Sequence, residues 1–593
     1  MRARRPITRV TAAAGLLAST LVVPGIFAGD ARADTFTEQT LHFAVKVGPA
    51  LNEPCDVIGT VVTPSSATPS TKVPAILTTN GFGGSMADQI PFAEKQAALG
   101  YLVLSYSGLG FGGSGCKITL DDPDYDGQAA KQLVSYLGGA PGIAFLDAAH
   151  TQPAPTLNLV KHDAFDHSGV PQTYDPRVGM WGGSYGGGIQ FASASVDPRI
   201  DTIIPAITWN DLSYSLSPNN TGQTSGVSTN PPGAVKTTWA ASLSAVGLLR
   251  GAQGAQDDPS RLIGCPNFAN WVCPAIVSGA VNGYLQQTDV NHLRHASVAT
   301  FLNKIKIPVL LDQAEVDTLF NLNEAIATFT ALKAQGTPVS MLWRLQGHSG
   351  GTPSAAGIAY ENARIQTWLD HYLKGVAGST GSKFAYYRDW TGTFAEATAL
   401  PTATKTYYLS SNHGLTTNLF GIGKSTQVMT TLGGGATSGT SSLDGIGSVL
   451  PVPALPDVNL PGAHVYWATP QLTSAVNVVG SPKLKVKVYA PTAFNTSGNP
   501  GGMLVLFAKI YDVAPDGTAS LINGLVAPVR VANPGQAFTV TLPAIVHKFA
   551  AGHRINITIA GGDLNYRGGL LPMPVTVTSG SSSQQLVLPT VAS

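Results

Sequence analysis

The segment Val178-Gly-Met-Trp-Gly-Gly-Ser-Tyr-Gly-Gly-Gly188 contains the pattern Gly182-x-Ser184-x-Gly186, directly after an apolar run and before a helical one. A serine at a sharp turn from strand to helix is the setting in which this pattern forms a nucleophile elbow. Glycines suit such a turn because a Cβ there would collide with the neighbouring chain. The run Gly112-Gly-Ser114-Gly115 shows that similar strings arise by chance, so the flanking strand and helix decide the interpretation. We therefore predict an α/β fold with Ser184 as its candidate nucleophile.

Short apolar strands alternate with helical stretches on both sides of this segment, from about residue 36 to residue 375. This alternation is typical of a mostly parallel sheet that helices cover on both faces. It predicts an α/β-hydrolase domain over residues 34–375. The clearest elements are strands at 74–78, 101–105, 178–181, 202–207, 307–312 and 339–345, and helices at 321–333 and 356–373.

The alternation stops between residue 212 and about residue 300, where Pro/Gly loops and helical runs such as 234–249 take its place. Long insertions of this kind in a compact domain commonly carry function. We predict a helical cap over the site, at about 212–300.

A serine hydroxyl needs a base, and the base needs an orienting carboxylate, in the chain order Ser, Asp or Glu, His for this fold. Asp317 follows the strand predicted at 307–312, and His348 follows the strand predicted at 339–345. Open α/β sheets place their sites at the carboxyl ends of strands. The sequence therefore predicts a catalytic triad of Ser184, Asp317 and His348.

Two alternatives stand beside this assignment. Glu315 and Asp312 are local competitors for the acid, and Asp317 could instead cap the following helix. His348 could be an ordinary loop histidine, one of twelve in the chain.

The oxyanion that develops during acyl transfer needs two hydrogen-bond donors. The backbone N–H of the residue after the nucleophile, here Tyr185, is the usual first donor. The second is expected from the loop Thr79-Asn-Gly-Phe-Gly-Gly84, through the N–H of Phe82 or Gly83, although a plain Gly-rich turn is an equal alternative.

The pattern changes after Lys374, where short alternating strands follow one another and no helical run continues. In Lys483-Leu-Lys-Val-Lys-Val488 the apolar residues fall on one face and the lysines on the other, as in a half-buried strand. Similar strands at 503–513, 537–542 and 554–559 predict an antiparallel sandwich or jelly roll. We predict a linker over 376–403 and an all-β jelly-roll domain over 404–593, with a long Gly/Ser/Thr-rich loop at 433–447.

Composition narrows the class of protein. The chain has 593 residues, of which 44% are hydrophobic, and this suffices for two buried cores. Charged residues make up only 12% and the net charge is +1, without a basic run beyond the N-terminus. A nucleic-acid-binding protein needs a basic patch, so nucleic acid is excluded as a partner.

The N-terminus has the sequence pattern of an export signal. Basic residues in Met1-Arg-Ala-Arg-Arg5 precede an apolar stretch at 10–27, and Ala31-Arg-Ala33 supplies small residues before Asp34. This order predicts a signal peptide over residues 1–33 and a secreted, extracellular protein. A retained anchor is the alternative, although no later segment is long enough to span a membrane. The export route, association with the cell envelope and the oligomeric state stay open.

Four cysteines in an exported chain indicate two disulfides. Three pairings are possible; we favour Cys265 with Cys273, which closes one short loop, and Cys55 with Cys116 by elimination. Buried free thiols are the alternative. No Cys or His pair has the spacing of a metal site, and no metal or organic cofactor is expected.

Several segments resemble the Xaa-Pro dipeptidyl-peptidase and cocaine esterase family, which includes α-amino-acid ester hydrolases and glutaryl-cephalosporin acylases. They are the segment from Asp175 to Gly187, the acid segment from Ile307 to Phe320, Gly347-His348, and Tyr511 to Gly517 with Gly552-His-Arg554 in the C-terminal part. The resemblance covers nearly the whole mature chain. It implies that the helical insert lines the acyl pocket and that the jelly roll packs beside it as a specificity-shaping domain. Much of the family uses a tyrosine hydroxyl of the early loop as oxyanion donor, whereas Asn80-Gly-Phe-Gly83 has none.

The expected activity is hydrolysis of a small-molecule ester, an amide or a short peptide, by a peptidase releasing Xaa-Pro dipeptides or by an esterase or acylase. A dipeptide's free amine needs acidic partners, and between residues 211 and 300 the acids are Asp211, Asp257, Asp258 and Asp289. This scarcity favours the esterase or acylase. The alternative of another class is a non-enzymatic glycan-binding or cell-wall-binding protein that uses the jelly roll, but an inert domain has no physical reason to keep a triad.

Overall fold

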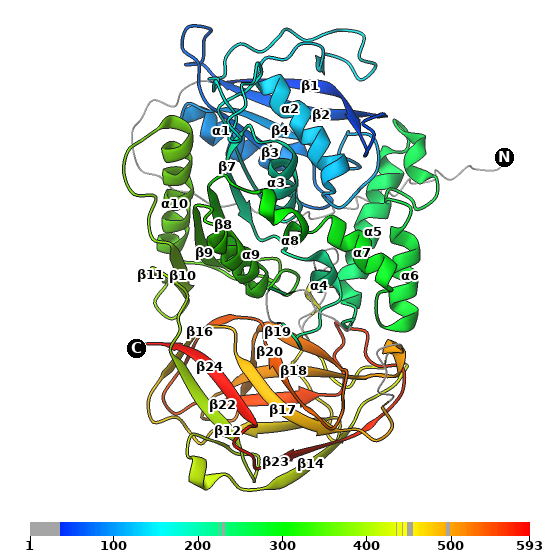
Figure 1. The fold of residues 1–593 in the computed structure, drawn as a ribbon, viewed down its shortest axis with the longest axis vertical. Helices are drawn as coiled ribbons and strands as arrows, with labels where there is room; N and C mark the ends of the chain where they lie inside the picture. The colour runs from blue at the N-terminus through cyan, green and yellow to red at the C-terminus, as the bar shows by residue number, and fades with distance from the viewer. Residues whose placement is uncertain are drawn as a thin grey trace, which may run out of the picture.

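The computed structural model describes residues 36–223, 226–227, 232–434, 436–441, 443–447, 455–493 and 499–592. The predicted signal peptide, residues 1–33, lies outside them. Two bodies are stacked along the long axis of the molecule, an α/β body and an all-β body, with a group of helices along one side (Figure 1).

The α/β body is built on one large sheet with the strand order β11-β10-β9-β8-β7-β6-β3-β4-β2-β1-β5. Strands β3, β4 and β6 to β10 run parallel, and β1, β2, β5 and β11 pair antiparallel at the two edges. The strands are β1 (Phe36–Val47), β2 (Glu53–Pro64), β3 (Ala75–Thr79), β4 (Leu102–Tyr106), β5 (Ala144–Phe145), β6 (Val178–Gly183), β7 (Ile200–Ala206), β8 (Val309–Val316), β9 (Val339–Gln346), β10 (Phe384–Arg388) and β11 (Thr393–Ala397).

Helices cover both faces of this sheet because its central strands are apolar on both sides. In β3, Ala75 and Leu77 face one core, whereas Ile76 faces another. One face packs on α1 (Ile90–Ala98) and α10 (Ala355–Lys374), and the other on α2 (Gln128–Leu137), α3 (Tyr185–Val196) and α9 (Leu322–Ala334). Continuous apolar strands of this kind are typical of buried parallel sheets, and the α/β-hydrolase prediction is confirmed.

The prediction of a linker over 376–403 is wrong in its middle part, because β10 and β11 lie there and extend the sheet. Phe384 of β10 pairs with Met341 of β9 in parallel, and β11 folds back on β10. Phe384 is fully buried and its ring meets Trp343 edge-on at 4.8 Å. Burial of aromatic residues against β9 therefore makes this segment part of the first body.

Several helices lie between β7 and β8 in the chain. They are α4 (Leu212–Leu216), α5 (Thr237–Gly254), the short η3 (Pro259–Leu262), α6 (Val272–Asn282), α7 (Gln287–His295) and α8 (Val298–Phe301). Among them, α5, α6 and α7 run along the side of the molecule (Figure 1). We call α4 to α7 the cap helices.

Both favoured disulfides are present, with Cα–Cα distances of 5.8 Å for Cys55–Cys116 and 5.5 Å for Cys265–Cys273.

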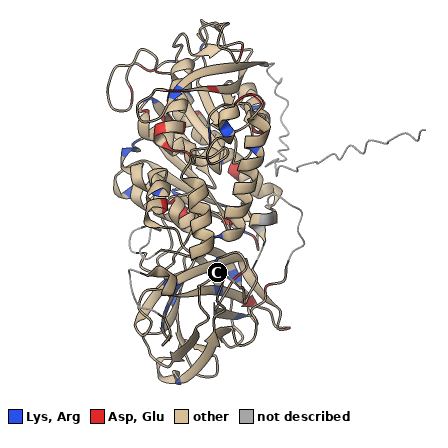
Figure 2. Ribbon diagram, turned by 90° about the vertical axis from the view of Figure 1, so that its right-hand side faces the viewer, with Lys and Arg blue, Asp and Glu red and all other residues tan. Residues whose placement is uncertain are grey.

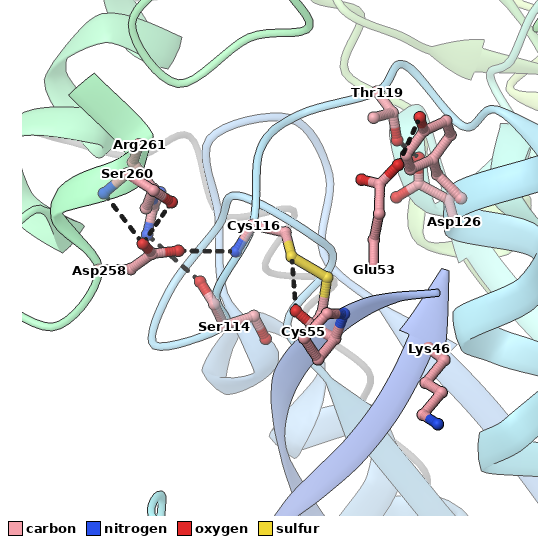
Figure 3. The surroundings of a disulfide bond; sticks show 12 residues. Lys46, Glu53, Cys55, Ser114, Cys116, Thr119, Asp126, Asp258, Ser260 and Arg261 are labelled. Atoms are coloured by element: carbon pink, nitrogen blue, oxygen red, sulfur yellow. Dashed lines mark hydrogen bonds between the residues drawn. A yellow bond between two sulfur atoms is a disulfide. The ribbon is translucent and has the colours of Figure 1, made fainter. Parts of the chain in front are cut away.

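The first disulfide lies where the cap is fastened to the sheet body (Figure 3). The N–H of Cys116 donates to Asp258 Oδ2 at 3.0 Å, and Arg261 Nη1 donates to the carbonyl of Ser114 at 3.2 Å. Asp258 and Arg261 belong to the segment around η3. The disulfide therefore ties β2 to the loop on which this part of the cap rests.

The second body consists of antiparallel strands, as predicted for a β-sandwich or jelly roll. A four-stranded sheet has the order β15-β22-β18-β19, and a larger sheet follows the order β13-β12-β24-β17-β23-β14 with β16, β20 and β21 attached. These strands are β12 (Thr404–Leu409), β13 (Leu415–Thr416), β14 (Ser425–Thr430), β15 (His464–Ala468), β16 (Val476–Gly480), β17 (Lys483–Tyr489), β18 (Leu504–Val513), β19 (Ala519–Val531), β20 (Ala537–Thr541), β21 (Ile545–Phe549), β22 (Arg554–Ala560), β23 (Pro574–Ser579) and β24 (Gln585–Val591). Their inward residues form a core of their own. The segment predicted as a loop at 433–447 contains one short helix, α11 (Asp444–Gly447).

Buried polar contacts join the two bodies. Arg530 of β19 donates to the carbonyl of Gly283 at 2.9 Å, and Asn323 of α9 donates to the carbonyl of Leu542 at 3.1 Å. Figure 2 shows that both acidic and basic residues occur along the ribbon on the cap side. In the part of the chain that the structure describes, no helix combines the length and the apolar character that crossing a membrane requires.

Candidate active site

Ser184 stands at the turn between β6 and α3, with φ 58° and ψ −121°. A non-glycine residue in such a conformation stores about 1–3 kcal/mol of strain, which the surrounding chain must offset. The glycines around it are required by close approach: a Cβ on Gly182 would lie 2.7 Å from the carbonyl of Gly186, and a Cβ on Gly186 would lie 2.7 Å from the carbonyl of Thr79. The sequence therefore folds here into the sharp strand-to-helix turn predicted for a nucleophile elbow, with Ser184 at the start of α3.

His348 follows β9, and its ring links the other two predicted residues. Its Nε2 lies 2.8 Å from Ser184 Oγ, and its Nδ1 lies 2.6 Å from Asp317 Oδ2. With the proton on Nδ1, the imidazole donates to the carboxylate and accepts from the hydroxyl. The rings of Phe320 and Trp239 meet the imidazole edge-on, at 5.4 and 6.0 Å between centroids. This packing holds the plane of the imidazole.

Asp317 is fully buried in the loop after β8. Its Oδ1 accepts the N–H groups of Leu319 at 3.0 Å and Phe320 at 2.8 Å, so Oδ2 is left to face His348. The hydrogen bonds from the Leu319 and Phe320 N–H groups, which resemble a helix cap, thus use Oδ1, whereas the contact with His348 uses Oδ2.

The two competing acids lie elsewhere. Asp312 is inside β8 and pairs with Arg344 at 3.3 Å. Glu315 is buried with no cation beside it among the described residues, and burial raises the pKa of its carboxyl well above the usual range. Neither contacts His348, so Asp317 is the acid that the fold brings to the histidine.

The loop predicted to supply the second oxyanion donor passes beside Ser184. A Cβ on Gly81 would lie 3.9 Å from Ser184 Cβ. The Phe82 ring packs edge-on against Tyr185 at 5.9 Å, and the Gly83 carbonyl accepts from Arg250 Nε at 2.5 Å. Neither the Phe82 nor the Gly83 N–H donates to any residue that the structure describes, so both stay candidates together with the Tyr185 N–H.

Several residues around Ser184, Asp317 and His348 were missed by sequence reasoning, because they meet these three only through long-range packing. Trp239 of α5 donates through Nε1 to Thr318 Oγ1 at 3.1 Å, and the Thr318 N–H donates to Ser349 Oγ at 2.9 Å. Lys236 Nζ donates to the carbonyls of Thr318 and Leu319. These contacts connect the acid loop to the histidine loop and to the cap.

A small cavity lies beside this cluster, between the cap, the acid loop and the second body. It is lined by Lys236, Trp239, Thr318, Ser441, Gly524, Asn565 and Tyr566. None of these described residues is acidic. Two of the cap acids serve local structure instead, since Asp211 accepts the N–H of Ser213 and Asp289 belongs to the first turn of α7.

One group among the described residues has the composition of a metal site. Ligand atoms of Asp122, Asp124 and His295 lie within 4.8 Å of one another. The group joins η2 (Pro123–Gly127) to the end of α7 and shares no residue with the Ser184 cluster.

Comparison with known proteins gives two matches to family models. Residues 57–350 match the X-Pro dipeptidyl-peptidase (S15 family) model, and residues 376–583 match the model of the X-Pro dipeptidyl-peptidase C-terminal non-catalytic domain. Among curated proteins the sequence has no significant match.

Solved structures with the same architecture cover nearly the whole chain. An aminopeptidase from a marine sediment archaeon, Thaumarchaeota archaeon, is 12% identical with a TM-score of 0.65 over 96% of this chain and 99% of its own. An α-amino acid ester hydrolase is 13% identical with a TM-score of 0.60 over 96% and 99%. A CocE/NonD family hydrolase from Staphylococcus aureus is 13% identical with a TM-score of 0.62 over 97% and 100%. At these identities the likeness concerns the fold.

Proposed function

Since this chain belongs to the X-Pro dipeptidyl-peptidase and cocaine esterase family of hydrolases, we propose that Ser184, His348 and Asp317 hydrolyse an ester or amide bond through an acyl-enzyme. The observation that carries the proposal is the continuous contact from Asp317 Oδ2 through His348 to Ser184 Oγ, at 2.6 and 2.8 Å. Nucleophile, base and orienting acid in mutual hydrogen-bond reach are what acyl transfer requires.

The reaction then runs in two balanced steps. His348 Nε2 takes the proton of Ser184 as Oγ attacks the carbonyl carbon, and returns that proton to the leaving alcohol or amine. Water repeats the attack on the acyl-enzyme, His348 again accepts and returns a proton, and the acid is released. Asp317 keeps the imidazole in the required tautomer and stabilises its charged form.

The oxyanion of each tetrahedral intermediate is assigned to backbone donors. The Tyr185 N–H lies at the start of α3, where helix N–H groups favour negative charge. The Gly-rich loop at Phe82 and Gly83 supplies the second N–H. The absence of a tyrosine in Asn80-Gly-Phe-Gly83 makes a backbone donor the available choice.

Within the family, the lining of the cavity favours an esterase or acylase over a dipeptidyl-peptidase. The free ammonium of a dipeptide substrate is expensive to bury without carboxylate partners. The small cavity next to the acid loop is instead lined by Lys236, by Trp239, whose ring meets His348, and by neutral groups, without an acid among its described residues. An uncharged acyl or leaving group suits this lining.

The test compares the mature protein with its Ser184→Ala variant on p-nitrophenyl acetate and butyrate and on Gly-Pro-p-nitroanilide. We expect the mature protein to hydrolyse the esters. In Ser184→Ala the ester turnover should fall by at least about 10³-fold, which is the order of the loss when a triad residue is removed. Ser195→Ala, which changes a serine at the far end of α3, is the matched control and should keep full turnover. Ester turnover that survives in Ser184→Ala would refute the assignment, and release of the dipeptide would establish the peptidase.

Export to the oxidising extracellular space is the proposed location. The apolar stretch at 10–27 and two disulfides in a chain without free cysteines support it. Mass spectrometry of protein from the culture medium should find a mature N-terminus near Asp34. Full-length protein that stays in the membrane fraction would favour the anchor.

A further inference from the structure

Lys236 carries a buried positive charge next to the acid loop. It precedes the first turn of α5 and is only 2% exposed. Its Nζ donates to the carbonyl of Thr318 at 2.7 Å and to the carbonyl of Leu319 at 2.8 Å. These are the two residues that directly follow Asp317.

The same two peptide units also hold the carboxylate. A peptide unit is planar and joins the carbonyl of one residue to the N–H of the next. The unit whose carbonyl belongs to Thr318 carries the N–H of Leu319, and the unit whose carbonyl belongs to Leu319 carries the N–H of Phe320. Both N–H groups donate to Asp317 Oδ1, at 3.0 and 2.8 Å. Lys236 and Asp317 therefore lie at opposite ends of two shared peptide dipoles.

We propose that Lys236 is a positioning residue for the catalytic acid, acting through the Thr318 and Leu319 peptide units. Its charge polarises both units, because hydrogen bonds arranged in series strengthen one another in a low-dielectric interior. Stronger donation to Oδ1 fixes the rotamer of Asp317, so Oδ2 stays aimed at His348 Nδ1. The inference rests on the proposed triad and deepens it, since it places a cap residue in control of the catalytic carboxylate.

The positioning of Asp317 by Lys236 should depend on pH, because burial and nearby charges shift the pKa of Lys236. Burial lowers the pKa of Lys236 to about 8, while the nearby Asp317 and Glu324 of α9 oppose that shift. Burial in turn raises the pKa of Glu324 to about 7, although it accepts from Ser215 and from the N–H groups of Asn210 and Asp211. As the pH rises through the pKa of Lys236, the ammonium becomes a neutral amine and the polarisation of the acid loop is lost.

The first measurement is the kinetics of Lys236→Met on the p-nitrophenyl esters. We expect kcat to fall about ten- to a hundredfold with KM unchanged, the range that loss of a charge-assisted hydrogen bond gives. Lys236→Arg, which keeps the charge, should recover part of the loss. Lys117→Met is the matched control, because Lys117 also donates to two backbone carbonyls, those of Ile263 and Cys265, away from the acid loop. It should keep the wild-type kcat.

The second measurement is the low-field proton resonance of His348 Nδ1–H in the substrate-free protein, which reports the bond to Asp317 directly. We expect it to move in Lys236→Met and not in Lys117→Met. In the wild type it should change as the pH rises past the pKa of Lys236, and this keeps the test decisive if Lys236→Met does not fold. If the position of the resonance changes neither in Lys236→Met nor with pH, the inference is overturned.

Failure of this inference is separable from failure of the proposed function. If Ser184→Ala is inactive while Lys236→Met keeps the wild-type kcat and resonance, the triad assignment is supported and the positioning role of Lys236 is refuted. If Ser184→Ala keeps turnover, the triad assignment falls, and the resonance still decides whether Lys236 acts on Asp317.

Discussion

Asp126 is a buried carboxyl behind the turn at Ser184, and no cation pairs with it among the residues that the structure describes. It is 3% exposed, and Thr119 Oγ1 donates to its Oδ2 (Figure 3). Burial raises the pKa of Asp126 to about 7, with the nearby Asp122 adding to the shift. The group is therefore neutral in the folded protein under mildly acidic conditions and ionised at alkaline pH.

Asp126→Asn should stabilise the protein at pH 8 and change little near pH 4. A carboxyl whose pKa is raised on folding weakens the fold as the pH climbs from the unfolded value, about 4, to the folded value of about 7. Above that range the penalty is complete and amounts to at most about 4 kcal/mol. Urea unfolding at both pH values measures it, and equal stabilisation at both would contradict the assigned pKa.

At the scale of elements, the two disulfides close loops of very different length. Cys55 and Cys116 are 61 residues apart, whereas Cys265 and Cys273 are 8 residues apart. Constraint of the unfolded chain grows with loop length, so replacing both cysteines of the first pair with serine should cost about 2 kcal/mol more than replacing both of the second. Guanidinium unfolding of the two double variants tests this order. Equal losses would mean that effects in the native state, and not the length of the closed loop, decide what each disulfide contributes.

The elements that sequence reasoning predicted are those whose signal is local. Strand β6 and the turn at Ser184 follow from one apolar run and its glycines, and β8 and β9 place Asp317 and His348 at neighbouring strand ends. Strand β10 was missed because its five residues follow a Gly/Ser-rich stretch, and only the packing of Phe384 on Trp343 makes it a strand of the sheet. Lys236 gave no signal, because its partners lie more than eighty residues away in the chain.

At the scale of the whole molecule, the jelly roll is held to the cap by a buried cation. Arg530 is 1% exposed and donates to the carbonyls of Gly283, Pro500 and Gly233, the first two at 2.9 and 2.5 Å. Burial lowers its pKa to about 10, so it is charged at neutral pH. No carboxylate among its described partners neutralises it, and backbone carbonyls of both bodies share the charge.

Arg530→Met should uncouple the two bodies, since it leaves these buried carbonyls without a donor. Each buried group left unsatisfied costs about 1–3 kcal/mol. Calorimetry is expected to resolve a separate, earlier transition for the jelly roll in the variant. Arg554→Met is the matched control, because Arg554 donates to Thr469 within the jelly roll and should not split the transition. If Arg530→Met unfolds in a single step at the wild-type temperature, other contacts, such as that of Asn323 with the carbonyl of Leu542, suffice to join the two bodies.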